Sequence, residues 1–208
     1  MGLRGHERPG TGAVLACSLA AGAIPFSNIA ARARAGVDLR EVGSGTVSGT
    51  SLFDVAGFGP LAVAGVCDVA KGAVGPLLAG ADRPALAAFA AGAAVAGHNW
   101  SPFLAGAGGR GISPAIGALA VTAWPASALL LGGLAVGRLL HQTALTSFVA
   151  DAALVPALAA ARGRRGALLG ACVVTPMLVK RALGNQRPAR PGWRTRAQRV
   201  LFDRDEPC

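Results

Sequence analysis

The chain has 208 residues, of which 52% are hydrophobic and 14% charged, and its formal net charge is +10. Soluble domains carry roughly 25% charged residues, so this composition excludes an ordinary soluble domain and indicates one membrane-embedded domain over residues 1–208. Apolar stretches alternate with short polar ones, which predicts an all-α polytopic helical bundle over residues 13–183 and a basic tail over residues 184–208. A basic cluster beside an apolar segment is typical of the cytosolic side and of contact with anionic lipid. We therefore expect membrane lipids, and not nucleic acid, as partners, while the oligomeric state stays open.

The cysteines and the N-terminal run indicate neither a metal site nor a cofactor. No CxxC spacing occurs, so the cysteines are expected to be small buried apolar residues and not metal ligands or a disulfide framework. They are Cys17, Cys67, Cys172 and Cys208. The apolar run from Ala13 is interpreted as a retained first span and not a signal peptide, because Ile24-Pro25-Phe26 makes a poor cleavage site and further apolar runs follow.

The first apolar segment covers residues 13–31, which is long enough for one membrane crossing. Pro25 lies inside it and is expected to kink the helix or end it early. A polar loop rich in Gly, Ser and Thr follows over residues 36–52. Loop amides, hydroxyl groups and the guanidinium of Arg40 together suit a phosphate; a plain linker is the alternative.

Two charges interrupt the second apolar segment, residues 55–80. Charged side chains at membrane depth are costly and are usually paired or functional. Asp68 and Lys71 are three positions apart, which puts them on one helical face where they can neutralise each other. The pattern predicts either an internal ion pair or a role at the functional site.

A second Gly-rich loop, residues 97–113, follows a third apolar segment, residues 84–96. Gly106, Gly108, Gly109 and Gly111 surround Arg110 in this loop. Glycine allows backbone to approach a ligand closely, successive N–H groups can form an anion-binding concavity, and an arginine adds a bidentate phosphate donor. The loop therefore predicts a phosphate site at a membrane surface.

The remaining apolar segments complete about seven short transmembrane helices. They cover residues 112–124, 126–140, 143–160 and 166–179. Trp124-Pro125 leaves open whether the first two form a single kinked span, and residues 162–165 separate the last two. Seven spans are favoured because both Gly-rich loops, the turn at residues 138–141 and the basic tail then share the side richer in Lys and Arg, which should be cytosolic.

Motifs in register over about residues 13–125 resemble the bacterial membrane glycerol-3-phosphate acyltransferases that use acyl-phosphate, the PlsY family. The motifs are Ala23-Ile24-Pro25-Phe26, Asp38-Leu39-Arg40 with Gly43-Ser44-Gly45 and Thr50, Asp68-Val69-Ala70-Lys71-Gly72, and Gly97-His98 with Phe103-Leu104 and Gly108-Gly109-Arg110-Gly111. The resemblance implies a seven-helix bundle in the bacterial inner membrane. It also implies transfer of a fatty acyl group from acyl-phosphate to the 1-hydroxyl of glycerol 3-phosphate, which gives lysophosphatidic acid in phospholipid synthesis.

The resemblance also assigns roles to individual residues. The expected catalytic residues are Arg40, Ser44, His98 and Arg110. The residues expected to bind substrate phosphate are Gly43, Gly45, Thr46, Thr50, Gly108, Gly109, Gly111, Lys71 and Arg181. Phe103 stands where other acyltransferases place the Asp of a His–Asp dyad, so substrate phosphate is the expected base. His98 has three open roles: orienting the loop, assisting proton transfer or bonding to backbone at the helix end. Arg181 has a membrane anchor as its alternative.

Some positions differ from the family motifs. Asp54, Thr175 and Leu178 stand where the family carries Arg, His and Asn. These replacements favour a second hypothesis, a catalytically degenerate homologue that binds lipid or phosphate in the membrane. A small transporter or scaffold, with Asp68 and Lys71 as a pathway element, is the third.

Overall fold

The computed structural model describes residues 8–43, 45–185 and 192–202, and within these ranges its regular structure is helical. This confirms the predicted all-α class. The helices are α1 (Thr11–Ala23), α2 (Phe26–Ala35), the 3₁₀ turn η1 (Leu39–Glu41), α3 (Gly49–Ala56), α4 (Phe58–Ala79), α5 (Pro84–Asn99), the 3₁₀ turn η2 (Pro102–Leu104), α6 (Ile112–Thr122), α7 (Trp124–Leu139), α8 (Thr143–Leu183) and α9 (Trp193–Phe202).

The bundle has the dimensions and surface of a membrane protein. Three helical stretches are long and apolar enough to cross a membrane, namely Thr11–Ala35, Phe58–Ala79 and Thr143–Leu183, and the shorter apolar helices Ile112–Thr122 and Trp124–Leu139 accompany them. Large apolar side chains such as Val63 and Val66 on α4 are 70% exposed, as expected of groups that face lipid. The exact number of crossings stays a prediction.

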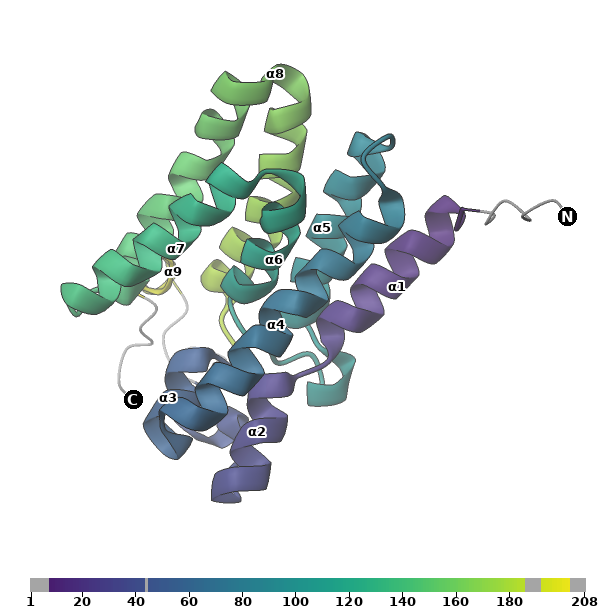
Figure 1. The fold of residues 1–208 in the computed structure, drawn as a ribbon. Helices are drawn as coiled ribbons and strands as arrows, with labels where there is room; N and C mark the ends of the chain where they lie inside the picture. The colour runs from purple at the N-terminus through teal and green to yellow at the C-terminus, as the bar shows by residue number, and fades with distance from the viewer. Residues whose placement is uncertain (1–7, 44, 186–191, 203–208) are drawn as a thin grey trace, which may run out of the picture.

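Helix breaks lie where the sequence places its special residues. Pro25 follows the end of α1 at Ala23, which confirms the expected early end of the first helix. Ala123 separates α6 from α7, so the Trp124-Pro125 region joins two packed helices and not one kinked helix. The long α8 breaks at Gly163 (φ 58°, ψ −142°), and Figure 1 shows the chain reversing direction there.

The polar stretch after α2 is more structured than the sequence indicated. Residues 36–52 were expected to form a loop, but α3 begins inside it at Gly49. The Ser48 hydroxyl accepts a hydrogen bond from the Ser51 amide (3.2 Å) and so caps the helix. Gly57, with a φ of 78°, then separates α3 from α4, which divides the segment predicted at residues 55–80.

Several polar connections gather at one end of the bundle. Figure 1 shows α2 and α3 at the lower end and the bend of α8 at the upper end. The Arg138 guanidinium lies 5.0 Å from the Phe53 ring, which brings the turn between α7 and α8 to the same end as α3. The two Gly-rich loops also meet at this end, through a hydrogen bond from the Val47 amide to the Gly108 carbonyl. The structure thus gathers the segments that were predicted to share one side.

Small residues let the helices approach closely, as in other membrane bundles. A Cβ atom on Gly72 of α4 would lie 1.9 Å from the Pro114 carbonyl oxygen of α6, and one on Gly22 of α1 would lie 2.2 Å from the Ala94 carbonyl oxygen of α5. A Cβ atom on Gly65, also in α4, would meet no atom of another described element within 4 Å. Packing of α4 against α6 therefore requires glycine at Gly72, whereas Gly65 has room for a side chain.

This contrast predicts opposite effects of the same substitution on one helix. Gly72→Ala should lower the free energy of unfolding by about 1–3 kcal/mol, because α4 and α6 must separate to admit a methyl group. Gly65→Ala should raise the free energy of unfolding by about 0.5–1 kcal/mol, because alanine is the better helix former. Thermal unfolding midpoints in one detergent, followed by tryptophan fluorescence, measure both; equal midpoints for the two variants would contradict the close α4–α6 contact.

Candidate active site

The two Gly-rich loops form one structural unit. The Val47 amide donates to the Gly108 carbonyl (3.1 Å), and the Gly109 amide donates to the His98 carbonyl (3.3 Å). Gly43 and Gly45 have φ values of 55° and 67°, a region that favours glycine. The sequence predicted both loops separately, and the structure joins them.

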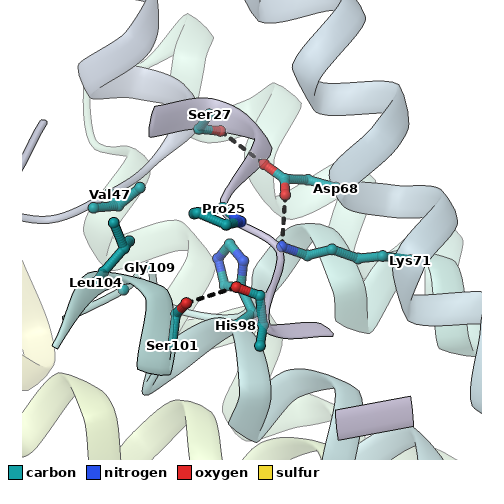
Figure 2. A pocket seen from close by; sticks show the side chains of 11 residues that line it. Pro25, Ser27, Val47, Asp68, Lys71, His98, Ser101, Leu104 and Gly109 are labelled. Carbon is teal, nitrogen blue, oxygen red and sulfur yellow. Dashed lines mark hydrogen bonds and ion pairs between the residues drawn. The ribbon is translucent and has the colours of Figure 1, made fainter. Parts of the chain in front are cut away.

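A small polar pocket lies beneath the joined loops. Its walls come from the break between α1 and α2, from the middle of α4, from the end of α5 and from the second Gly-rich loop (Figure 2). The lining residues are Ala23, Pro25, Ser27, Val47, Asp68, Lys71, His98, Ser101, Leu104, Gly108 and Gly109. Of the predicted site residues, the structure brings Lys71, His98, Gly108 and Gly109 to this lining.

Asp68 and Lys71 form the predicted ion pair. The Lys71 Nζ lies 2.7 Å from the Asp68 Oδ1, and the two side chains are 3% and 4% exposed. The Ser27 hydroxyl donates to the Asp68 Oδ2 (2.7 Å), and the Lys71 Nζ donates to the Ile24 carbonyl (2.6 Å). Figure 2 shows that Asp68 contacts both Ser27 and Lys71, above the His98 ring. The pair is thus confirmed and fastens α4 to the break after α1, while phosphate binding by Lys71 stays a prediction.

His98 lies directly against the glycines of its own loop. A Cβ atom on Gly109 would lie 2.2 Å from the His98 Nε2, and one on Gly108 would lie 2.2 Å from the His98 carbonyl oxygen. Only glycine at both positions therefore allows the loop to fold over a buried histidine. Of the roles predicted for His98, this contact favours orientation of the loop.

Arg110 and Lys180 connect the second loop to the end of α8. Arg110 is buried, and its Nη1 donates to the Lys180 carbonyl (3.0 Å). The Lys180 Nζ donates to the Gly106 carbonyl (3.2 Å) and lies 5.3 Å from the Trp100 ring centre. Lys180 was not among the predicted site residues, although its ammonium group contacts the second loop itself.

Arg40 lies in the first Gly-rich loop and forms an ion pair with Asp38. The Arg40 Nη2 lies 2.7 Å from the Asp38 Oδ2, and Arg32 bonds to the same carboxylate. In this loop, outside the membrane-spanning segments, the Arg40 and Arg32 guanidinium groups hold the pKa of Asp38 well below its ordinary value of 3.8. Asp38 in turn raises the pKa of Arg40. Arg40 keeps 35% of its side chain exposed, so it can also reach a ligand.

The other predicted phosphate ligands differ in position. Thr46 is buried and its carbonyl accepts from the Ser51 hydroxyl (2.9 Å), whereas Thr50 is exposed at the start of α3. Gly111 precedes α6 with a φ of 83°. The amides of Gly45, Gly108 and Gly109 donate within the protein and fix the loop shape. Ser44 lies outside the described residues.

Arg181 does not belong to the pocket lining. Its Nε lies 3.6 Å from the Asp151 Oδ2, and both side chains are buried. Its Nη1 donates to the carbonyls of Ala144 and Val200, each at 3.1 Å. Arg181 therefore ties both halves of α8 and α9 together, and its predicted contact with phosphate gains no support from this geometry.

Asn185 is a site residue that sequence reasoning missed. Its Nδ2 donates to the carbonyls of Gly45 (2.9 Å) and Gly108 (2.8 Å), and its Oδ1 accepts from the Gly108 amide (3.3 Å). It lies just after α8, in a segment interpreted only as the start of a basic tail. A lone asparagine there carries no local signal of a contact with a loop 140 positions earlier.

An apolar groove adjoins the polar pocket. It has a volume of about 790 Å³ and runs between α1, α5 and the second half of α8. Its lining residues are Leu15, Ala16, Leu19, Phe89, Gly92, Ala93, Ala96, Trp100, Ala171, Cys172, Thr175, Pro176 and Val179. Trp100 of the groove directly precedes Ser101 of the pocket in the chain, so the apolar and polar sites lie on either side of this stretch.

These features define a helical membrane protein with a polar site beside an apolar groove. The glycerol-3-phosphate acyltransferase family model matches residues 12–187, and the chain belongs to this family. This confirms the family that the sequence motifs resembled. All of α8 and all of the pocket fall inside the matched region, whereas α9 lies beyond it.

Similar proteins agree with this assignment. The chain is 43% identical over 102 residues to glycerol-3-phosphate acyltransferase 1 of Deinococcus radiodurans, an alignment that covers 48% of this chain and 51% of the relative. It is 39% identical over 103 residues to a glycerol-3-phosphate acyltransferase of Shouchella clausii, covering 48% and 50%. The chain thus spans about half the length of the curated relatives that it matches.

The fold is shared with a solved membrane enzyme. The glycerol 3-phosphate form of the integral membrane glycerol 3-phosphate acyltransferase PlsY superimposes with a TM-score of 0.74 and 22% identity, over 82% of this chain and 87% of that one. Its lysophosphatidic acid form gives a TM-score of 0.71 and 19% identity over the same shares. These similarities establish a common fold.

Proposed function

We propose that the protein transfers a fatty acyl group from acyl-phosphate to the 1-hydroxyl of glycerol 3-phosphate, giving lysophosphatidic acid. The observation that carries the proposal is the meeting of the joined Gly-rich loops and their pocket with the apolar groove at Trp100 and Ser101. Such a junction suits a reaction in which an acyl chain and two phosphate groups come together. The names of the curated relatives and of the solved structures support the same chemistry.

The proposed reaction takes place at the cytosolic face of the bacterial inner membrane. Both Gly-rich loops and the basic end of α8 lie together, and positively charged segments are typical of the cytosolic side. Both phosphate-bearing substrates would then reach the loops from the cytosol. The acyl chain of the donor would enter through the membrane, and the lysophosphatidic acid product would leave into it.

Acyl-phosphate is a mixed anhydride and needs little further activation. The 1-hydroxyl oxygen attacks the acyl carbon, the bond from that carbon to the phosphate oxygen breaks, and phosphate leaves with the electron pair. The hydroxyl proton passes to the phosphate. Catalysis then consists of positioning the reactants and stabilising developing charge. Arg40 and Arg110 supply positive charge to the substrate phosphates, and His98 holds the loop in place.

A direct assay decides between this proposal and a degenerate homologue. Purified protein in lipid nanodiscs is incubated with acyl-phosphate and glycerol 3-phosphate, with acyl-CoA as the control donor, and lysophosphatidic acid is measured by mass spectrometry. We expect product with acyl-phosphate and none with acyl-CoA. Binding of glycerol 3-phosphate without product from any donor would replace the proposal with the lipid- or phosphate-binding hypothesis.

Arg40 and Arg110 should both be needed for turnover. Replacing either with Ala removes a cation beside the developing charge, and we expect kcat to fall by roughly 100-fold or more. Arg110→Lys keeps the charge but loses the planar fork, so its activity should lie between those of wild type and Arg110→Ala. Arg34→Ala, on the exposed side of α2, is the matched control. Retained turnover in Arg40→Ala or Arg110→Ala would remove that residue from the site.

The apolar groove should determine which acyl chains are used. Ala96→Phe places a ring inside the groove and should shift the preference toward shorter chains. A long chain must displace the ring at a cost of about 1–3 kcal/mol, so kcat/KM for long donors should fall by roughly tenfold. Ala62→Phe, on the exposed face of α4, controls for added bulk. An unchanged chain-length profile in Ala96→Phe would show that the acyl chain binds elsewhere.

A further inference from the structure

Asn185 joins the two Gly-rich loops with a single side chain. One amide nitrogen donates to a carbonyl of each loop, at Gly45 and at Gly108, and the amide oxygen accepts from the Gly108 N–H. The contact with Gly108 uses its donor and its acceptor together, as a paired strand would. Among uncharged side chains, a carboxamide offers both groups in one plane.

Residues of α9 bond to the backbone just before Asn185, on the side away from the Gly-rich loops. The Arg199 Nη1 donates to the Leu183 carbonyl (2.6 Å) at the end of α8. Gly184 has a φ of 67°, and a Cβ atom there would lie 2.9 Å from the Arg199 Cζ. Arg181 adds the bond to the Val200 carbonyl. The turn that presents Asn185 is therefore fixed on α8 and α9, outside the loops that it joins.

The hydrogen bonds of Asn185 fix the distance between the two Gly-rich loops, which the sequence of each loop does not determine. Gly45 and Gly108 lie in separate loops, and both loops have small residues and bends that permit several conformations. The Val47 amide also links the two loops, and it bonds to the same Gly108 carbonyl that Asn185 contacts. Without the Asn185 amide, the relative position of the two loops would depend on fewer bonds.

We propose that Asn185 is a positioning residue that holds the two Gly-rich loops at the spacing at which they bind the phosphate-bearing substrate. The expected change in KM rests on the proposed acyl transfer. The positioning of the loops rests on the contacts of Asn185 alone. Asn185 acts through the loops, which touch the substrate, and α9 holds Asn185 in place.

The test compares substitutions of one side chain. Asn185→Ala removes all three contacts, Asn185→Asp puts an oxygen against two carbonyl groups, and Asn185→Gln keeps the carboxamide on a longer stem. Gln198→Ala, an exposed amide on α9, is the matched control. Each variant is assayed for kcat and for KM toward glycerol 3-phosphate, and hydrogen–deuterium exchange is measured over residues 43–52 and 104–112.

We expect Asn185→Ala to raise KM for glycerol 3-phosphate about tenfold while kcat changes less than about threefold, because positioning is lost but the charged groups remain. Asn185→Asp should show the larger loss, and Asn185→Gln should recover part of it. Exchange should rise in both loops in Asn185→Ala and stay unchanged in Gln198→Ala. Wild-type KM and wild-type exchange in Asn185→Ala would overturn the inference.

The exchange measurement separates this inference from the proposed function. If the wild-type protein makes no lysophosphatidic acid, the proposed function fails and the exchange data still decide the role of Asn185. Faster exchange in both loops of Asn185→Ala would then support the positioning role. Unchanged exchange would overturn it whatever the activity of the wild type.

Discussion

The structure depends on hydrogen bonds to the backbone carbonyl groups that have no partner where its helices end. The last carbonyls of every helix lack an intrahelical partner, and in a membrane water is not there to replace it. In this chain, Lys and Arg side chains fill that role. The Lys71 ammonium bonds to Ile24 after α1, and Arg110 and Arg199 bond to Lys180 and Leu183 at the end of α8. Positive charge near a helix C-terminus is also favoured by the helix dipole.

This use of cations explains how a site assembles from short helices. Each such bond ties a side chain of one element to the end of another, so α1, α4, the second loop, α8 and α9 become fixed relative to each other. The Lys71 side chain reaches one of these helix ends from inside the pocket lining, where Asp68 balances its charge. The ion pair of Asp68 with Lys71 and that of Asp38 with Arg40 limit positive charge. A buried pair costs desolvation, and here its bonds to Ser27 and Ile24 offset part of that cost.

Local signals in the sequence predicted the local features. The i,i+3 spacing predicted the Asp68–Lys71 pair, Pro25 predicted the end of α1, and the glycine clusters predicted both loops. Two of the features that were missed depend on contacts between distant segments. Nothing in the sequence near Asn185 indicates the Gly45 carbonyl, and nothing near Arg181 indicates its ion pair with Asp151. The helix α3 was missed because its cap, Ser48, lies in a stretch whose composition is typical of a loop.

The positions that depart from the family motifs lie apart from the polar pocket. Asp54 is exposed on α3, Thr175 lines the apolar groove, and Leu178 packs against the main apolar core. The residues that do line the pocket include His98, the Asp68–Lys71 pair and the two glycines that fold over the histidine. An acidic group that faces solvent on α3 adds little field inside a buried pocket, because water screens exposed charges. The three replacements therefore lie outside the lining of the polar pocket, and the assay of acyl transfer decides whether turnover survives them.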